Sequence, residues 1–218
     1  MMTFARILAR KCFAWALPVL LVGCQARSPD TESLEYSQEL YASCVQCHGD
    51  NGQGNREIGA PAIAGLTRWY VKRQLRHFKR GYRGFHPEDT NGKKMEPMAR
   101  ALDTDQKVDL VSAYVASMPP THPAPTLEGG NAETGKIYFA VCVQCHGPDA
   151  GGNVEQFGPP LADASDWYLL RQLQNFKAGI RGTHPGDVTG AKMRPFSMTL
   201  PSEQSMKDVI AYIKTLSE

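Results

Sequence analysis

The sequence predicts an all-α protein built from two tandem domains. The motif Cys-Val-Gln-Cys-His occurs at residues 44–48 and again at residues 142–146. The sequence around the first motif recurs at a constant offset of 98 residues (142 minus 44). No segment shows a convincing alternation of apolar and polar residues, which would predict a half-buried strand. Together these observations indicate a duplicated helical domain.

The offset holds without a gap through most of the chain. Trp69-Tyr70 matches Trp167-Tyr168, and Ala113-Tyr114 matches Ala211-Tyr212. Roughly two in five aligned positions are identical, which indicates one tandem duplication rather than a solenoid. We expect a first domain over residues 34–118 and a second over residues 133–218. Residues 119–132 are rich in Pro and Gly and predict a semi-rigid linker between them.

Each half is expected to contain short helices joined by long turns. A first helix, from about Ser33 in one copy and residue 132 in the other, leads into the repeated motif. A second helix begins near Thr67, or near Ser165 in the other copy, because both residues are good N-caps. Gly81 and Gly179 are placed to end these second helices.

A last helix closes each half. It is expected to begin near Asp103 in the first copy and near Pro201-Ser202 in the second, and to run to the domain end. It carries Tyr114 or Tyr212 toward the interior. The sequence therefore predicts a first and a last helix that pack together in each domain.

The repeated Cys-x-x-Cys-His motif is typical of covalent haem c attachment. Two sulfurs three residues apart can reach the two vinyl groups of one porphyrin, and the following histidine can bind the iron. We therefore expect two haem c groups, each wrapped by one domain. The residues that would hold them are Cys44, Cys47 and His48 in the first copy, and Cys142, Cys145 and His146 in the second.

A methionine is the expected sixth iron ligand in each copy. The candidates are Met95, Met98 and Met118 in the first copy, and Met193, Met198 and Met206 in the second. Only Met95 and Met193 match each other at the 98-residue offset, and both lie in a Lys-Met-x-Pro sequence. We expect a proline-restricted loop to hold each thioether against its haem, since His/Met ligation raises the haem potential.

Two other metal-binding arrangements compete with this assignment. His86 and His184 also match in register and could give bis-histidine ligation, although a loop histidine bonded to backbone or propionate is the simpler interpretation. Paired Cys-x-x-Cys sequences can also bind structural zinc. Zinc is disfavoured because a histidine follows each pair at once and the pairs lie in separate copies.

Basic side chains suggest two further roles. Arginines at matched positions are candidates to pair with the haem propionates, because a guanidinium can bind a carboxylate through two hydrogen bonds; they are Arg73, Arg83, Arg171 and Arg181. The first copy also has seven cations and no acid between Arg68 and Arg83, whereas the second keeps only three over the matching stretch. This stretch is either a solvated helix face or a docking patch for an acidic redox partner.

The N-terminus is read as an export signal. Arg6, Arg10 and Lys11 precede an apolar run, so we expect residues 1–23 to be a signal peptide. Leu21-Val22-Gly23-Cys24 resembles a bacterial lipobox, which predicts lipidation of Cys24 and a tether over residues 24–33. Removal of the signal lowers the formal net charge from +2 to about −1. Nucleic acid is a poor partner for an exported, haem-bearing chain.

The whole pattern resembles a di-haem class I cytochrome c of the cytochrome c4 family. The resemblance includes the paired haem motifs, the Tyr-x-x-x-Gln-Leu segments at residues 70–75 and 168–173, and a methionine seven residues before Leu102 or Leu200. It implies a periplasmic electron carrier, not an enzyme. It also implies partners such as a membrane oxidase or a quinol-oxidising complex, with electrons passing toward a terminal oxidase.

Two alternative functions are kept open. The chain could be the cytochrome subunit of a membrane oxidase or dehydrogenase complex, in which a lipid anchor at Cys24 would serve assembly. A di-haem peroxidase is the enzymatic alternative, and it needs one iron with an open or displaceable ligand. The near symmetry of the two copies argues against a peroxidase.

Overall fold

The computed structural model describes residues 29–217, and in this part of the chain all regular structure is helical. Its elements, in chain order, are α1 Pro29–His48, α2 Arg68–Lys79, α3 Thr90–Ala101, α4 Asp105–Ser117, α5 Ala132–Phe139, α6 Val143–His146, α7 Asp166–Lys177, α8 Val188–Met198 and α9 Glu203–Lys214. The predicted all-α fold class is confirmed.

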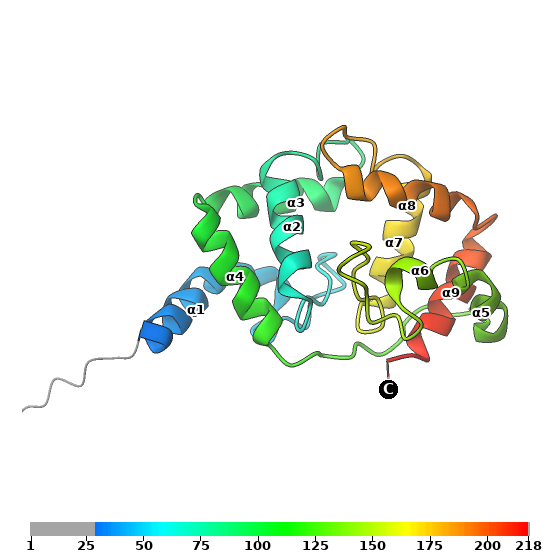
Figure 1. Cartoon of the computed structure of the whole chain (residues 1–218), viewed down its shortest axis with the longest axis horizontal. Coiled ribbons are helices and arrows are strands. Elements are labelled where there is room, and N and C mark those ends of the chain that lie inside the picture. The colour runs from blue at the N-terminus through cyan, green and yellow to red at the C-terminus, as the bar shows by residue number, and fades with distance from the viewer. Residues whose placement is uncertain (1–28, 218) are drawn as a thin grey trace, which may run out of the picture.

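The two halves form separate lobes with separate cores. Figure 1 shows α1–α4 on one side and α5–α9 on the other, with α2 and α7 between them and the linker passing from α4 to α5 along one edge. The first core is built around Tyr41, Val108 and Val111, and the second around Phe139 and Ile210. Each domain therefore has its own hydrophobic interior, as a tandem duplication requires.

The 98-residue offset extends to the helix boundaries. Helices α2 and α7 have matching limits, and Thr67 and Ser165 are their N-caps as predicted. Gly81 and Gly179 follow these helices at φ angles of 71° and 76°, where a residue with a side chain would be strained. The copies differ in the first helix, since α1 is continuous while residues 140–142 separate α5 from α6.

First and last helices pack together in both domains, as expected. Tyr41 of α1 lies against Tyr114 of α4 with ring centroids 5.3 Å apart, and Phe139 of α5 lies 5.4 Å from Tyr212 of α9. In the second domain the backbones approach closely at Gly135. A Cβ at that position would lie 1.9 Å from the carbonyl oxygen of Asp208, so only glycine fits.

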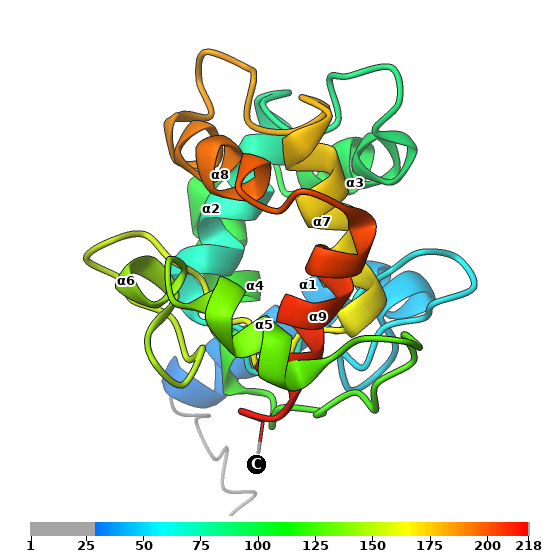
Figure 2. The same cartoon turned by 90° about the vertical axis from the view of Figure 1, so that its right-hand side faces the viewer.

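The helices that carry Met95 and Met193 were not predicted. We expected a loop around each Lys-Met-x-Pro sequence, but Pro97 lies inside α3 and Pro195 inside α8. The loop prediction is wrong, because an N-cap starts each helix before the proline is reached. Asp89 and Asp187 accept hydrogen bonds from the backbone of the third helical residue. Figure 2 shows α3 and α8 at the same end of the molecule.

The linker is fastened to the second domain. Asp166, which is buried, accepts hydrogen bonds from the backbone N–H groups of Thr126 and Leu127 and from the Thr126 hydroxyl. Asn131 N–H donates to Asp208 at 2.8 Å. The first copy has Arg68 at the position of Asp166. The acid that the second copy gains therefore has a structural purpose.

Candidate functional site

The two haem-attachment motifs lie on the last turn of α1 and on α6. Cys44, Cys47, Cys142 and Cys145 are all free thiols, so none is used in a disulfide. Burial raises the pKa of the Cys44 thiol, and it raises that of Cys142 to about 11. These thiols are therefore neutral groups in apolar surroundings. All four cysteines line one continuous cavity that runs through both domains, which we call the shared cavity.

The motif histidines have a fixed orientation. His48 and His146 are buried, and their Nδ1 atoms lie 2.9 and 2.8 Å from the carbonyl oxygens of Pro61 and Pro159. A carbonyl oxygen can only accept a hydrogen bond, so Nδ1 must carry the proton and Nε2 keeps its lone pair. Burial lowers the pKa of both imidazoles. Each histidine is thus held as a neutral ring with Nε2 available to a metal.

Met95 and Met193 line the same cavity as the two histidines. The competing methionines fit a ligand role less well. Met118 and Met206 are packed into the two cores, and Met198 is 59% exposed. Met98 reaches the cavity lining but has Phe196 as its counterpart in the second domain. The structure therefore brings a thioether to each pocket from matched helices, although from helices rather than loops.

His86 and His184 lie outside the residues that line the shared cavity. Their Nδ1 atoms accept hydrogen bonds from the backbone N–H groups of Glu88 and Gly186, at 3.2 and 3.0 Å. Both are loop histidines bonded to neighbouring backbone. The geometry therefore disfavours bis-histidine ligation.

The predicted propionate arginines meet at the boundary between the domains. Arg83 donates to Gln74 of its own domain at 2.8 Å and to Gln172 of the other domain at 3.3 Å. Arg181 donates to the same two glutamines, at 2.7 Å to Gln172 and 3.1 Å to Gln74. We call these four side chains the Arg–Gln ring. The ring spans the boundary between the domains, and each domain contributes one arginine and one glutamine to it.

The outer pair of arginines also crosses the boundary. The Arg171 guanidinium donates to the Gly59 carbonyl oxygen at 3.3 Å. The Arg73 guanidinium lies 4.4 Å from the ring centre of Phe157, over its face. All four predicted arginines line the shared cavity. The sequence did not predict the contacts that Arg73 and Arg171 make with the opposite domain.

The cavity has the donors that a pair of haem groups requires. The Nε atoms of Arg83 and Arg181 are buried and have no hydrogen-bond partner among the described residues. Burial alone would lower the pKa of Arg83, but nearby tyrosine hydroxyls, that of Tyr168 first, raise it. The charged guanidiniums therefore have unused donors that suit haem carboxylates. Together with paired thiols, an imidazole Nε2 and a thioether in each pocket, the residues fit haem c.

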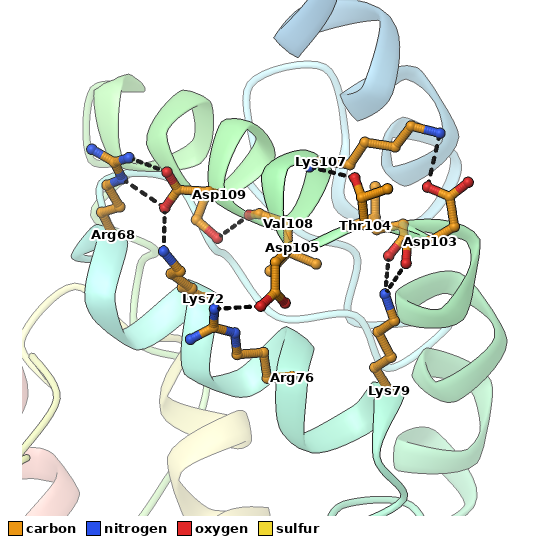
Figure 3. Close-up of polar contacts among 12 residues, drawn as sticks. Arg68, Lys72, Arg76, Lys79, Asp103, Thr104, Asp105, Lys107, Val108 and Asp109 are labelled. Atoms are coloured by element: carbon orange, nitrogen blue, oxygen red, sulfur yellow. Dashed lines mark hydrogen bonds and ion pairs between the residues drawn. The ribbon is translucent and has the colours of Figure 1, made fainter.

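Four cations of the basic stretch in the first domain bind α4 or the segment that leads into it. Arg68 and Lys72 both pair with Asp109 of α4, and Arg76 pairs with Asp105 at 3.0 Å (Figure 3). Lys79 Nζ donates to the carbonyl oxygens of Leu102 and Asp103 (Figure 3). These four cations help to hold α2 against α4, and the docking-patch interpretation of the stretch stays a prediction. The acids were missed because they lie about 30 to 40 residues further along the chain.

Sequence reasoning also missed several polar residues at the domain boundary. Gln74 and Gln172 match at the 98-residue offset, and that repetition could have identified them. His77 and Asp187 form another contact, at 3.3 Å, which no repeat signals because Asn175 occupies the matching position of His77.

Cys24 lies outside the described residues. Among the helices of residues 29–217, none is both long enough and apolar enough to cross a membrane.

Comparison with known proteins agrees with this site. The family model of cytochrome c matches twice, over residues 34–119 and 132–217. The chain is 32% identical over 204 residues to the thiosulfate dehydrogenase electron acceptor of Stutzerimonas stutzeri (strain A1501), covering 86% of this chain and 90% of that one. It is 32% identical over 184 residues to cytochrome c4 of Azotobacter vinelandii, covering 80% and 85% respectively.

A solved structure shows the same arrangement. Reduced cytochrome c4 from Pseudomonas stutzeri superposes with a TM-score of 0.62 at 28% identity, over 83% of this chain and 97% of that one. The chain belongs to the cytochrome c family. With two tandem domains, it is a di-haem cytochrome c of the cytochrome c4 type, an electron carrier with two covalent haem c groups.

Proposed function

We propose that this chain carries electrons in the bacterial periplasm, with His48 and Met95 as axial ligands of one haem and His146 and Met193 as those of the other. The observation that supports this most strongly is the shared cavity, where both ligand pairs lie in matched positions. Each haem supplies a one-electron change of its iron between the ferric and ferrous states. We propose that the electrons pass toward a terminal oxidase.

The residues of the chain have distinct tasks in this proposal. The four motif cysteines would fix the two haems in the cavity through thioether bonds, and the Pro61 and Pro159 carbonyls hold the histidine rings in one tautomer. Arg83 and Arg181 would bind haem carboxylates with their unused Nε donors. Because both ligand pairs come from helices, we expect the coordination shell to change little when an iron gains or loses an electron.

Replacement of each methionine tests the ligand assignment. Met95→Leu should remove the weak long-wavelength absorption band of methionine-ligated ferric haem from one haem only, and Met193→Leu should remove it from the other. Met98→Leu is a matched control that should leave both haems unchanged. If neither spectrum changes in the first two variants, the assignment is wrong. Peroxide turnover by the purified holoprotein, or a high-spin haem at rest, would instead favour a di-haem peroxidase.

A second candidate function is supported by the similarity to the thiosulfate dehydrogenase electron acceptor. In this case the chain would take electrons from a dehydrogenase that oxidises thiosulfate. The test mixes oxidised holoprotein with a thiosulfate dehydrogenase and thiosulfate, and follows haem reduction. Reduction at rates that saturate with the dehydrogenase would support this donor. Reduction only by a quinol-oxidising complex would exclude it.

We also propose export by the signal at residues 1–23 and anchoring by lipid at Cys24. The supporting observation is the lipobox-like Leu21-Val22-Gly23-Cys24 sequence. Metabolic labelling with a radioactive fatty acid should mark the wild-type protein and leave Cys24→Ser unlabelled. A labelled serine variant would contradict the anchor. If the holoprotein copurifies at a fixed ratio with an oxidase or dehydrogenase, it is a subunit rather than a free carrier.

A further inference from the structure

The domain boundary contains a second contact region, and the residues at the matched positions do not form a reciprocal copy of it. It joins His77, Tyr82 and Phe85 of the first domain to His184, Gly186 and Asp187 of the second, and we call these six residues the clasp. They come from the end of α2 and from the turns that precede α3 and α8, and α3 and α8 lie at the same end of the molecule (Figure 2). The clasp shares no residue with the Arg–Gln ring, and none of its residues is a predicted haem-attachment residue or iron ligand.

The clasp holds the turn that leads into α8. The Tyr82 ring stacks on His184 with centroids 4.7 Å apart and an interplanar angle of 25°, and Phe85 meets the same imidazole edge-on at 5.2 Å. A Cβ at Gly186 would lie 2.4 Å from Tyr82 Cζ. Glycine at this position is therefore required for the tyrosine ring to pack against the turn.

The turn ends at Asp187, which caps α8. Its Oδ1 accepts a hydrogen bond from Gly190 N–H at 2.8 Å and lies 3.3 Å from His77 Nδ1. Asp187 is 1% exposed. Burial opposes its ionisation, but His77 and the charge of Arg181 lower its pKa below the ordinary value. The charged cap of α8 is thus bonded by a side chain of the other domain.

The equivalent turn of the first domain is held differently. Asp89 caps α3 and accepts hydrogen bonds from Gly84 and Gly92, both in its own domain. The residues that would form a reciprocal clasp are replaced, since the counterparts of His77, Tyr82 and Phe85 are Asn175, Ile180 and Thr183. Glu88 occupies the position that matches Gly186. The N-cap of α3 is therefore bonded within its own domain, whereas the N-cap of α8 is also bonded by the other domain.

We infer that the clasp positions Met193, because the N-cap of its helix is bonded by His77 of the first domain, whereas the N-cap of the Met95 helix is bonded within its own domain. This inference rests on the proposed ligand role of Met193. Met193 lies in the second turn of α8, immediately beyond the cap that the clasp grips. A displaced cap would shift this short helix, and the thioether would leave the iron more often. His77 and Tyr82 are positioning residues in this account.

Two variants of the full holoprotein test the inference. His77→Asn and Tyr82→Ile each introduce the residue found at the matching position of the second domain. Imidazole, which competes with methionine for ferric iron, is titrated into each variant. We expect its affinity for the second haem to rise about tenfold, the size of one charge-assisted hydrogen bond, while the first haem is unchanged. Proton NMR of the ferric protein separates the two paramagnetically shifted ligand methyl signals, which Met95→Leu and Met193→Leu assign.

The controls separate the possible failures. Arg80→Ala removes an exposed side chain near the same helix end and should change neither haem. Asn175→His should leave Met95 ligation unchanged, because both oxygens of Asp89 are already engaged. If neither clasp variant affects the second haem, or if both haems respond equally, the inference is wrong. If Met193→Leu leaves the second haem unchanged, the ligand assignment fails instead.

Discussion

Arg83 of the first domain donates a hydrogen bond to the side-chain oxygen of Gln172 in the second, at 3.3 Å. The reciprocal bond, from Arg181 to Gln74, is 3.1 Å long. Both guanidiniums are buried in the wall of the cavity that the two haem sites share. A buried positive charge favours the reduced state of a nearby iron, and here it lies beside both sites.

Arg83→Gln should therefore lower the reduction potentials of both haems. We expect a shift of about 60 mV for the first haem, which corresponds to about 1.4 kcal/mol for one electron, and a smaller shift in the same direction for the second. Spectroelectrochemical titration of the holoprotein measures both values. Arg80→Gln, which removes an exposed charge from the same helix end, should have a much weaker effect because water screens it. A shift confined to one haem would contradict the shared role of the ring.

The duplication supplies a matched test at Tyr41, whose counterpart is Phe139. The Tyr41 hydroxyl donates to the Gly49 carbonyl oxygen at 2.8 Å, immediately after the first haem motif. Tyr41→Phe should lower the free energy of unfolding of the first domain by about 1 kcal/mol. The reverse change, Phe139→Tyr, should not stabilise the second domain unless its hydroxyl finds an equivalent acceptor. Urea unfolding monitored at each haem measures both effects.

Tyr41 also predicts how stability depends on alkaline pH. Burial raises its pKa from the ordinary value of 10.0 to about 12. Since the folded state retains this proton above the pH at which the unfolded state loses it, stability is full below about pH 10 and falls between about pH 10 and 12. Tyr41→Phe should remove this part of the alkaline loss. An unchanged alkaline profile in the variant would mean that other groups cause it.

Asp166 holds the linker against the second domain. Burial opposes the ionisation of Asp166. Its two oxygens accept hydrogen bonds from Thr126, Leu127 and Trp167, and these bonds lower its pKa below the ordinary value. Asp166→Asn should cost about 1–3 kcal/mol at neutral pH, because an amide cannot accept on both sides. Stability from this carboxylate is present above the unfolded pKa of 3.8 and is lost as the pH falls through the lower folded value.

Urea unfolding near neutral pH and below about pH 3 checks this prediction, since wild type and Asp166→Asn should converge in acid. The matching residue of the first domain, Arg68, is a natural control. Arg68 is exposed and pairs with Asp109, so Arg68→Gln should cost less than about 1 kcal/mol. Equal effects of the two substitutions would show that Asp166 is an ordinary surface acid.

Asp109 masks the charge of two cations on the surface of α2 (Figure 3). Asp109→Asn should leave Arg68 and Lys72 without their acid and make the first domain more attractive to anions. Stability should change by less than about 1 kcal/mol. Oxidation of the reduced protein by ferricyanide, an anionic reagent, should become faster at low salt and approach the wild-type rate at high salt. A rate independent of salt would mean that this face has no part in the encounter.

Local sequence features predicted much of the fold. The haem motifs and the helix stops at Gly81 and Gly179 depend on residues close together in the chain, and the structure contains the helices they imply. The 98-residue register selected Met95 and Met193, which both line the cavity. The helical environment of these methionines was missed because Pro97 and Pro195 outweighed the N-capping acids Asp89 and Asp187 in the interpretation.

The cofactor and the domain plan follow from local sequence features, because haem attachment needs a fixed spacing of side chains along one helical turn. The partners of the long polar side chains depend on the tertiary structure. Arg68 and Lys72 meet acids of α4, while Arg83 crosses to Gln172 and His77 crosses to Asp187. Such partners are set by how helices pack, and packing brings together residues that no local pattern connects.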